Sequence, residues 1–255
     1  MPSFGIIAEG VTDQNVIEAI LAGYFGDDDP DVAYIQPPVD ATGRGPAVGN
    51  AGWGMVFKHF ETGEYAKALD YRDYLVVQID TDVSEQKGYD VPWRDGARDL
   101  TPEELVARVV ERFRRIVGDA DFEKYGRRLI FAVSVHSIEC WLLPLLYTDN
   151  KRSKITGCGD AANKALARAD KDKLSNAAGE KFPRAYQDAA RLREAERGGE
   201  RREAQREPRG LPRRARRPLL DRRARLKRAS RYGNAMLHGQ LPVDREVTPL
   251  RRLPM

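Results

Sequence analysis

The opening of the chain places the tightest constraint on its fold, because a short apolar run leads through a carboxylate and a glycine into a helix. Residues 4–7 read Phe-Gly-Ile-Ile, the pattern of a short buried strand. Gly10 interrupts the strand, and Thr12 or Asp13 is expected to cap a helix whose apolar residues repeat at helical spacing. This unit places Glu9 at the carboxyl edge of a sheet, where open α/β sheets bind ligands, with Asp13 one helical turn away.

A second acidic pair follows a later strand. Residues 74–79 form an apolar run that ends in Asp80-Thr81-Asp82. If the extended geometry continues, Asp80 and Asp82 lie on the same face of the strand and point into one pocket. Acids gathered at strand ends repel one another unless a cation lies between them. Their hard oxygen atoms suit Mg²⁺ or Mn²⁺.

A third acid lies in an apolar segment after the strand expected at residues 129–135. Glu139 is followed by Cys-Trp-Leu-Leu, and burying its carboxylate without a partner is unfavourable. Two interpretations stay open: Glu139 is a further metal ligand, or it forms a salt bridge with an arginine or lysine. His136, at the end of the same strand, is expected to be structural. The remaining elements are a strand at 32–36 and helices at 55–60, 66–71, 101–117 and 161–174.

These motifs together resemble the TOPRIM domain. The resemblance covers residues 4–185 and rests on Glu9-Gly-x-Thr-Asp13, on Asp80-x-Asp82, and on the strand and helix around Glu139. The stretch around Glu139 resembles small stand-alone TOPRIM proteins of unknown function, which often sit among bacterial defence genes. The chain as a whole also resembles the overcoming-lysogenization-defect nucleases. The resemblance implies an α/β, Rossmann-like fold with a mostly parallel sheet flanked by helices. It also implies metal binding by Glu9, Asp13, Asp80, Asp82 and Glu139, with Glu9, Asp80 and Asp82 catalytic.

The reaction expected from this resemblance is phosphodiester hydrolysis that depends on Mg²⁺ or Mn²⁺. No tyrosine stands at a recognisable strand-transfer position, and the chain is too short for a companion primase or topoisomerase domain. The alternative is a non-catalytic accessory protein that binds metal and nucleic acid. The resemblance also implies a possible partner ATPase, and the sequence contains no GxxxxGK[ST] motif of its own.

Basic residues in two regions are candidates for contact with a nucleic-acid backbone. A glycine-rich stretch at residues 43–54 suggests close approach to a phosphate, although a flexible connection explains it equally well. A basic loop at residues 151–154 is the second region, with a solvated loop as the commoner explanation. The candidates are Arg44, Lys58, Lys151, Arg152 and Lys154.

The charge divides the chain into two parts. Residues 1–187 carry 23 lysines and arginines against 30 acidic residues, whereas residues 188–255 carry 20 against 9. The first part is expected to be the α/β domain, and the second an arginine-rich tail with too few apolar residues to form a core. The tail is either an arm that adds affinity for nucleic acid or, slightly favoured, the product of out-of-frame translation of a GC-rich gene.

The expected location is the cytoplasm, without a membrane partner. No apolar run approaches the length that spans a bilayer. The two cysteines, Cys140 and Cys158, are too few for a disulfide framework and are expected to be reduced in a reducing cytosol. Cys140 is interpreted as a small apolar residue of the core.

Overall fold

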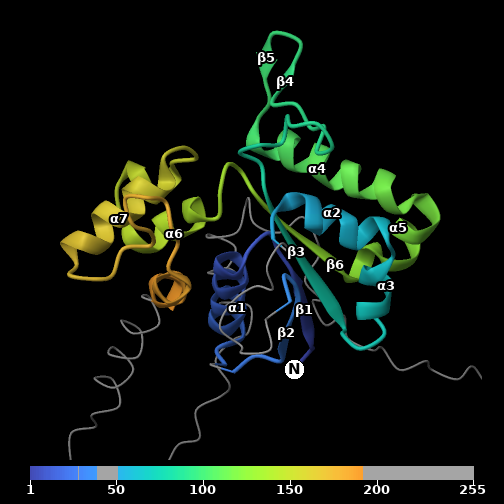
Figure 1. Cartoon of the computed structure of the whole chain (residues 1–255), viewed down its shortest axis with the longest axis horizontal. Coiled ribbons are helices and arrows are strands. Elements are labelled where there is room, and N and C mark those ends of the chain that lie inside the picture. The colour runs from blue at the N-terminus through green and yellow to red at the C-terminus, as the bar shows by residue number, and fades with distance from the viewer. Residues whose placement is uncertain (28, 39–50, 192–255) are drawn as a thin grey trace, which may run out of the picture.

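The computed structural model describes residues 1–27, 29–38 and 51–191. The predictions for Arg44 and for the tail from residue 192 onward therefore lie outside the described residues. Within them, an α/β protein with a parallel sheet flanked by helices is confirmed (Figure 1). No helix among them is long and apolar enough to cross a membrane.

The central sheet has four parallel strands in the order β2-β1-β3-β6. They are β1 (Phe4–Ile7), β2 (Val32–Gln36), β3 (Tyr74–Asp80) and β6 (Leu129–Ser134). The inner strands are apolar on both faces because helices cover both faces, which is why they appear in the sequence as continuous apolar runs. All four agree with the predicted ranges to within one residue.

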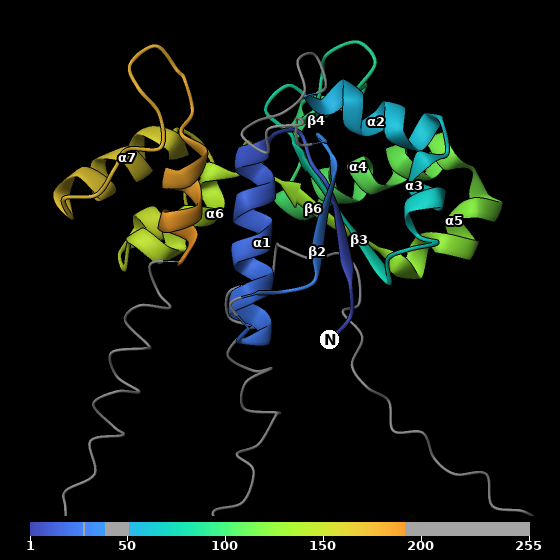
Figure 2. The same cartoon turned by 60° about the horizontal axis from the view of Figure 1, so that its bottom comes forward.

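Two groups of helices cover the two faces of the sheet (Figures 1 and 2). One face packs against α1, and the other packs against α2, α3 and α4. The helices of this part of the chain are α1 (Val11–Phe25), α2 (Trp53–Glu61), α3 (Glu64–Ala68), α4 (Pro102–Val117), α5 (Asp119–Tyr125) and the 3₁₀ turn η1 (Gly126–Arg128). Between β3 and α4, a short hairpin of β4 (Arg94–Asp95) and β5 (Arg98–Asp99) projects from the body of the protein.

A helical lobe stands beside α1 and has a core of its own. It contains α6 (Glu139–Leu146), the 3₁₀ turn η2 (Asn150–Ser153), α7 (Cys158–Arg168) and a helical segment at residues 183–191. Val16 of α1 packs into this core, and the Asn15 side chain donates to the carbonyl of Pro183 at 3.0 Å. The last helical segment passes through residue 187, the boundary expected from charge, and continues to the end of the described residues.

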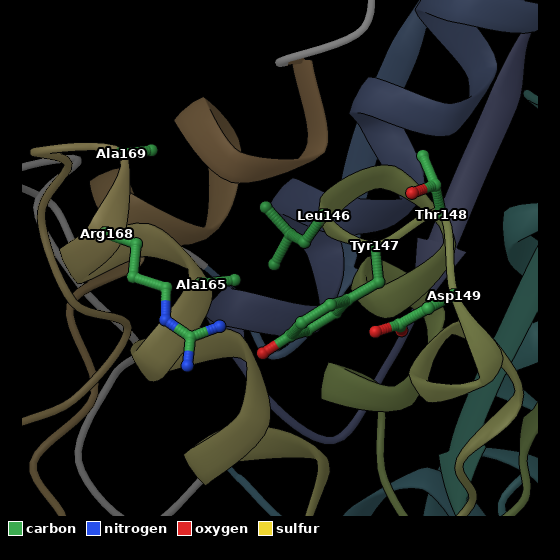
Figure 3. Close-up of a pocket in the computed structure, with 7 residues that line it drawn as sticks. All are labelled: Leu146, Tyr147, Thr148, Asp149, Ala165, Arg168 and Ala169. Atoms are coloured by element: carbon green, nitrogen blue, oxygen red, sulfur yellow. The ribbon is translucent and has the colours of Figure 1, made fainter.

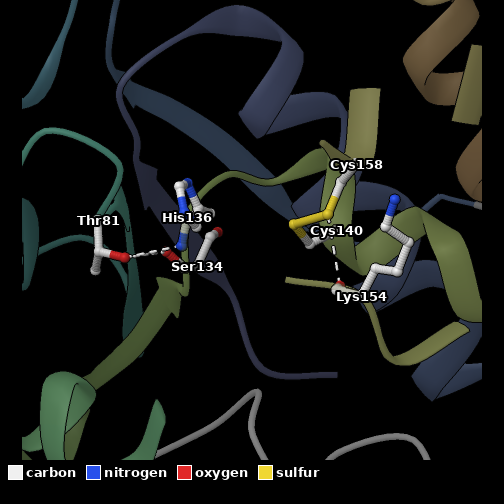
Figure 4. The surroundings of a disulfide bond; sticks show 6 residues. All are labelled: Thr81, Ser134, His136, Cys140, Lys154 and Cys158. Carbon is white, nitrogen blue, oxygen red and sulfur yellow. Dashed lines mark hydrogen bonds between the residues drawn. A yellow bond between two sulfur atoms is a disulfide. The ribbon is translucent and has the colours of Figure 1, made fainter. Parts of the chain in front are cut away.

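A disulfide joins α6 to α7 in this lobe, so the expectation of two reduced cysteines is wrong. Cys140 and Cys158 are buried, with their Cα atoms 4.9 Å apart (Figure 4). A sequence separation of 18 residues did not reveal the contact, because it depends on how the intervening turn folds α7 back onto α6. The same close packing brings Gly159 against the side chain of Glu139.

Two helix starts show how local sequence and tertiary context compete. Thr101 caps α4 as predicted: its hydroxyl accepts the N–H of Glu104, and the Glu104 carboxylate accepts the N–H of Thr101. The start of α1 differs from the prediction, because the cap is Gly10 and both Thr12 and Asp13 lie inside the first turn. Asp13 is thereby turned inward and buried instead of capping at the surface.

The capping box of α4 yields a prediction for stability. Thr101→Ala leaves the N–H of Glu104 without its side-chain acceptor and should lower the free energy of unfolding by about 1 kcal/mol. Urea denaturation measures this as a lower midpoint at an unchanged slope. Thr101→Ser is the matched control, because its hydroxyl preserves the hydrogen bond; a loss as large as that of alanine would contradict the assignment.

A buried acidic site at the carboxyl edge of the sheet

The topology places a switch point between the carboxyl ends of β1 and β3. β1 lies between β2 and β3. The connection from β1 to β2 runs through α1 on one face of the sheet, and the connection from β2 to β3 runs through α2 and α3 on the other face. This reversal of direction is where open α/β sheets bind ligands. Glu9 follows β1 and Asp80 ends β3, so both predicted acids lie at this position.

A network of hydrogen bonds fixes Glu9 against Asp80. Oε1 of Glu9 accepts the backbone N–H of Asp80 at 2.7 Å, and the backbone N–H of Glu9 donates to Oε1 of Gln78 at 3.2 Å. The Gln78 amide in turn donates to Oδ1 of Asp80 at 2.8 Å. Gln78 is fully buried and was missed by the sequence analysis. The sequence did carry a sign of its role, because Gln78 is a polar residue inside an otherwise apolar run.

Asp13 reaches the same site from the first turn of α1. Its side chain is 4 % exposed, and Oδ1 has no hydrogen-bond partner within the described residues. The other oxygen lies close to Gly10, whose backbone stabilises the charged form. A buried carboxylate oxygen without a partner is unfavourable, so this atom marks a position at which a cation would be stabilised.

Glu139 completes the cluster but is already paired. The ammonium of Lys181 lies 2.8 Å from its Oε1, and the hydroxyl of Tyr186 donates to the same oxygen. Of the two interpretations left open for Glu139, the salt bridge is the one present in this structure. Neither Lys181 nor Tyr186 was predicted, because both come from the last described segment, more than 40 residues further along the chain.

Burial and mutual repulsion perturb the acids strongly. Burial raises the pKa of Glu9 and that of Asp13 to about 7 each, and it raises the pKa of Asp80 well above its usual value. Negative neighbours add to each shift, whereas the charge of Lys181 opposes it. Burial alone would also raise the pKa of Glu139, but Lys181 and the hydrogen bonds it receives bring that pKa down to about 2.

The extended geometry on which the shared face of Asp80 and Asp82 depended does not continue past Asp80. β3 ends at Asp80, and the chain then turns, with the N–H of Asp82 donating to the carbonyl of His136 at 3.0 Å. Thr81 fixes this turn: its hydroxyl accepts the N–H of His136 at 2.8 Å and donates to the carbonyl of Ser134 (Figure 4). Asp82 is exposed at the rim, still near enough to raise the pKa of Glu9.

The acidic residues match a divalent ion in their donor atoms but not in their present arrangement. The donors are hard carboxylate oxygens, and Asp13 offers an unpartnered one, which suits Mg²⁺ or Mn²⁺. However, the described residues contain no group of three or more acidic, histidine or cysteine side chains already arranged around one point. Glu9, Asp80 and Glu139 are each turned toward a protein donor. The type of donor atom suits a divalent ion, but these side chains would have to rotate away from their present partners to hold one.

The predicted nucleic-acid contacts lie elsewhere on the described surface. Lys58 is exposed on α2, and Lys151, Arg152 and Lys154 are exposed in and directly after η2. Lys151 pairs with Asp149 at 3.1 Å. No described contact joins these four side chains to the acids. His136 packs its ring against Trp93 at 4.7 Å, consistent with its expected structural role.

A separate pocket lies in the helical lobe, between the end of α6 and α7 (Figure 3). Its volume is about 320 Å³, and none of the acids of the site lines it. The lining residues are Leu146, Tyr147, Thr148, Asp149, Ala165, Arg168 and Ala169. The hydroxyl of Tyr147 is already bonded to the carbonyl of Ala161, which leaves Arg168 and Asp149 as the charged groups of its wall.

The fold and site together define an α/β protein with an acidic centre at the crossover of a parallel sheet. Comparisons with protein families, with curated proteins and with solved structures find no match. The interpretation of the site therefore depends on its own geometry and charge.

The raised pKa of Asp13 predicts a pH-dependent penalty on folding. Its carboxyl group titrates near 3.8 when unfolded and near 7 when folded, so the penalty is absent below about pH 4 and complete above about pH 7. In EDTA, Asp13→Asn should therefore match the wild type near pH 4 and exceed it in stability near pH 8. The expected gain is roughly 1 to 3 kcal/mol, because each pKa unit corresponds to about 1.4 kcal/mol and neighbouring acids share the repulsion.

Thermal and urea unfolding across this pH range measure that gain. Asp172→Asn is the matched control, since Asp172 is exposed and outside the cluster, and its effect should stay within about 0.5 kcal/mol. A stability difference for Asp13→Asn that does not grow with pH would contradict a buried, repelled carboxylate.

Proposed function

We propose that this chain is a TOPRIM-like nuclease that uses Mg²⁺ or Mn²⁺ to hydrolyse phosphodiester bonds. The observation that carries the proposal is the convergence of Glu9, Asp13 and Asp80 at the crossover of the sheet, with a buried oxygen of Asp13 left without a partner. Acids that repel one another weaken a fold unless a cation lies between them, whereas a metal-dependent phosphodiesterase uses such acids to hold its ion.

In this proposal Asp13 and Asp80 hold the ion, with Glu9 and exposed Asp82 beside it. A bound divalent ion would polarise the phosphate and stabilise negative charge on the attacking and leaving oxygens. Glu9 has one oxygen committed to the N–H of Asp80, which leaves Oε2 to accept a proton from the attacking water.

The substrate proposed is nucleic acid, and the exposed basic residues supply its phosphate contacts. Lys58, Lys151, Arg152 and Lys154 lie at the surface, and Arg44 belongs to the same proposal. A partner ATPase, a role in bacterial defence and a cytoplasmic location follow from the resemblance to stand-alone TOPRIM proteins and remain part of the proposal.

One observation favours a second candidate, a non-catalytic accessory protein that binds nucleic acid. The acids of the described site are turned toward protein donors, and Lys181 already supplies a positive charge among them. A protein of this kind would need the cluster only for structure or regulation. The two candidates differ in whether cleavage accompanies binding.

Cleavage assays separate them. The full chain, incubated with single- and double-stranded DNA and RNA, should cut at least one of these in Mn²⁺ or Mg²⁺ and none in EDTA. Asp80→Asn should lower the cleavage rate by at least about 100-fold while leaving binding intact, because it removes a negative ligand of the ion. Asp172→Asn serves as the control and should retain the wild-type rate. Binding without cleavage by the wild type would favour the accessory protein.

The basic turn predicts a change in salt dependence. If Lys151, Arg152 and Lys154 each neutralise one phosphate, replacing all three by alanine should reduce the slope of log affinity against log salt by about 2 to 3. Fluorescence anisotropy at several salt concentrations measures that slope. Replacing Lys171 and Lys173, exposed in the following loop, by alanine is the comparison, and an equal change there would argue against a specific contact surface.

A further inference from the structure

The walls of the pocket in the helical lobe are held by two bonds between the segments around α6 and α7. The disulfide of Cys140 with Cys158 joins these helices near their starts, and their last turns line the pocket. The hydroxyl of Tyr147 donates to the carbonyl of Ala161 at 2.8 Å, which holds the aromatic wall against α7. A volume of about 320 Å³ is at the lower end of the range for small-molecule sites, so the pocket suits a compact ligand.

The charged groups at the pocket leave one positive charge without a partner. Asp149 is committed to Lys151, because its Oδ1 accepts the backbone N–H of that residue at 2.9 Å and its Oδ2 lies 3.1 Å from the ammonium. Arg168 has no ion pair within the described residues, and its guanidinium extends toward Tyr147 in Figure 3. The pocket therefore favours an anion, and a planar guanidinium can meet a phosphate or carboxylate through two parallel hydrogen bonds.

Much of the remaining wall is apolar or aromatic. Leu146 and Ala165 line it with carbon atoms, and the ring of Tyr147 stands beside them. The ammonium of Lys151 lies 5.3 Å from the centre of this ring, so a cation is present next to the aromatic wall as well. A flat aromatic group gains apolar contact and ring contact at such a wall. The pocket therefore suits an anion that carries a planar ring better than a purely polar ion.

We infer that this pocket binds a nucleoside monophosphate, with the phosphate at the guanidinium of Arg168 and the base against Tyr147 and Leu146. The same chemistry occurs in a free nucleotide and in the phosphorylated end of a nucleic-acid strand. A free amino acid fits the pocket less well, because its ammonium requires an acid and Asp149 is already paired. The inference does not depend on the acidic site at the sheet edge, since none of those acids lines the pocket.

Calorimetric titration of the full chain with adenosine monophosphate tests the inference. EDTA is present, so that no divalent ion at the acidic site contributes to phosphate binding. The wild type should bind one adenosine monophosphate per chain with a Kd below about 1 mM. Arg168→Met should weaken this binding by about 10- to 100-fold, because the hydrogen bonds of a charged group to the phosphate are lost. Lys164→Met, exposed on the same helix but outside the pocket, is the matched control and should leave the Kd unchanged.

A variant that fills the pocket tests the same site without changing its charge. Ala165→Leu places a larger apolar side chain in the pocket and keeps a residue that favours a helix, and circular dichroism with thermal unfolding checks its fold. It should weaken the binding of adenosine monophosphate by at least about 10-fold. With the wild type, adenosine and inorganic phosphate should each bind at least about 10-fold more weakly than adenosine monophosphate, because each lacks one part of the contacts.

A short DNA strand, with and without a 5′-phosphate, separates the two sources of the ligand. If the phosphorylated strand binds more tightly than adenosine monophosphate and loses that advantage in Arg168→Met, the ligand is a strand end; if it does not bind more tightly, the ligand is a free nucleotide. Both results support the pocket. Undetectable binding of adenosine monophosphate, a Kd unchanged in Arg168→Met, or inorganic phosphate bound as tightly would overturn the inference. Cleavage is measured separately in Mn²⁺, so the proposed function succeeds or fails independently of these results.

Discussion

The structure depends on the need to balance negative charge that the fold itself buries. A parallel sheet with helices on both faces leaves its carboxyl edge as the place where strand ends and helix starts meet, and here three of these positions carry acids. Gln78, the backbone N–H of Asp80 and the first turn of α1 each stabilise part of this charge. None of them neutralises it, so the acids keep protons at a pH where ordinary carboxylates have lost them.

This balance explains why the helical lobe is part of the site. The lobe packs on α1 through neutral contacts such as Val16 and the Asn15 amide, and these set its position. It then contributes a carboxylate and an ammonium as a bonded pair, Glu139 with Lys181. A pair with no net charge can be brought to the edge of an acidic cluster with little repulsion, and the ammonium can still act on the acids beyond it.

The sequence predicted the elements that depend on local pattern. β1, β3 and β6 are readable because burial on both faces leaves few polar residues in them, and α4 is readable from its Thr101 cap. The placement of Glu9, Asp13 and Asp80 at one edge of the sheet followed from their positions directly after strands and at a helix start. What failed depended on contacts between distant segments. The turn that leaves Asp82 at the rim depends on the hydrogen bond of Thr81 to His136, directly after β6. The disulfide depends on the packing of α7 against α6. The lysine that pairs with Glu139 comes from a loop more than 40 residues further along the chain. No local signal carries that information.

The pairing of Glu139 with Lys181 also means that the charge of the acidic site affects how firmly the helical lobe is held against the sheet. Electrostatic attraction between the lobe and the sheet comes from one ammonium facing the acids Glu9, Asp13 and Asp80. When those acids are neutralised, by protons or by a cation, this attraction is lost, and the apolar packing of the lobe against α1 and the sheet remains. The attraction between the helical lobe and the sheet is therefore strongest when these acids are ionised and no other cation is bound to them.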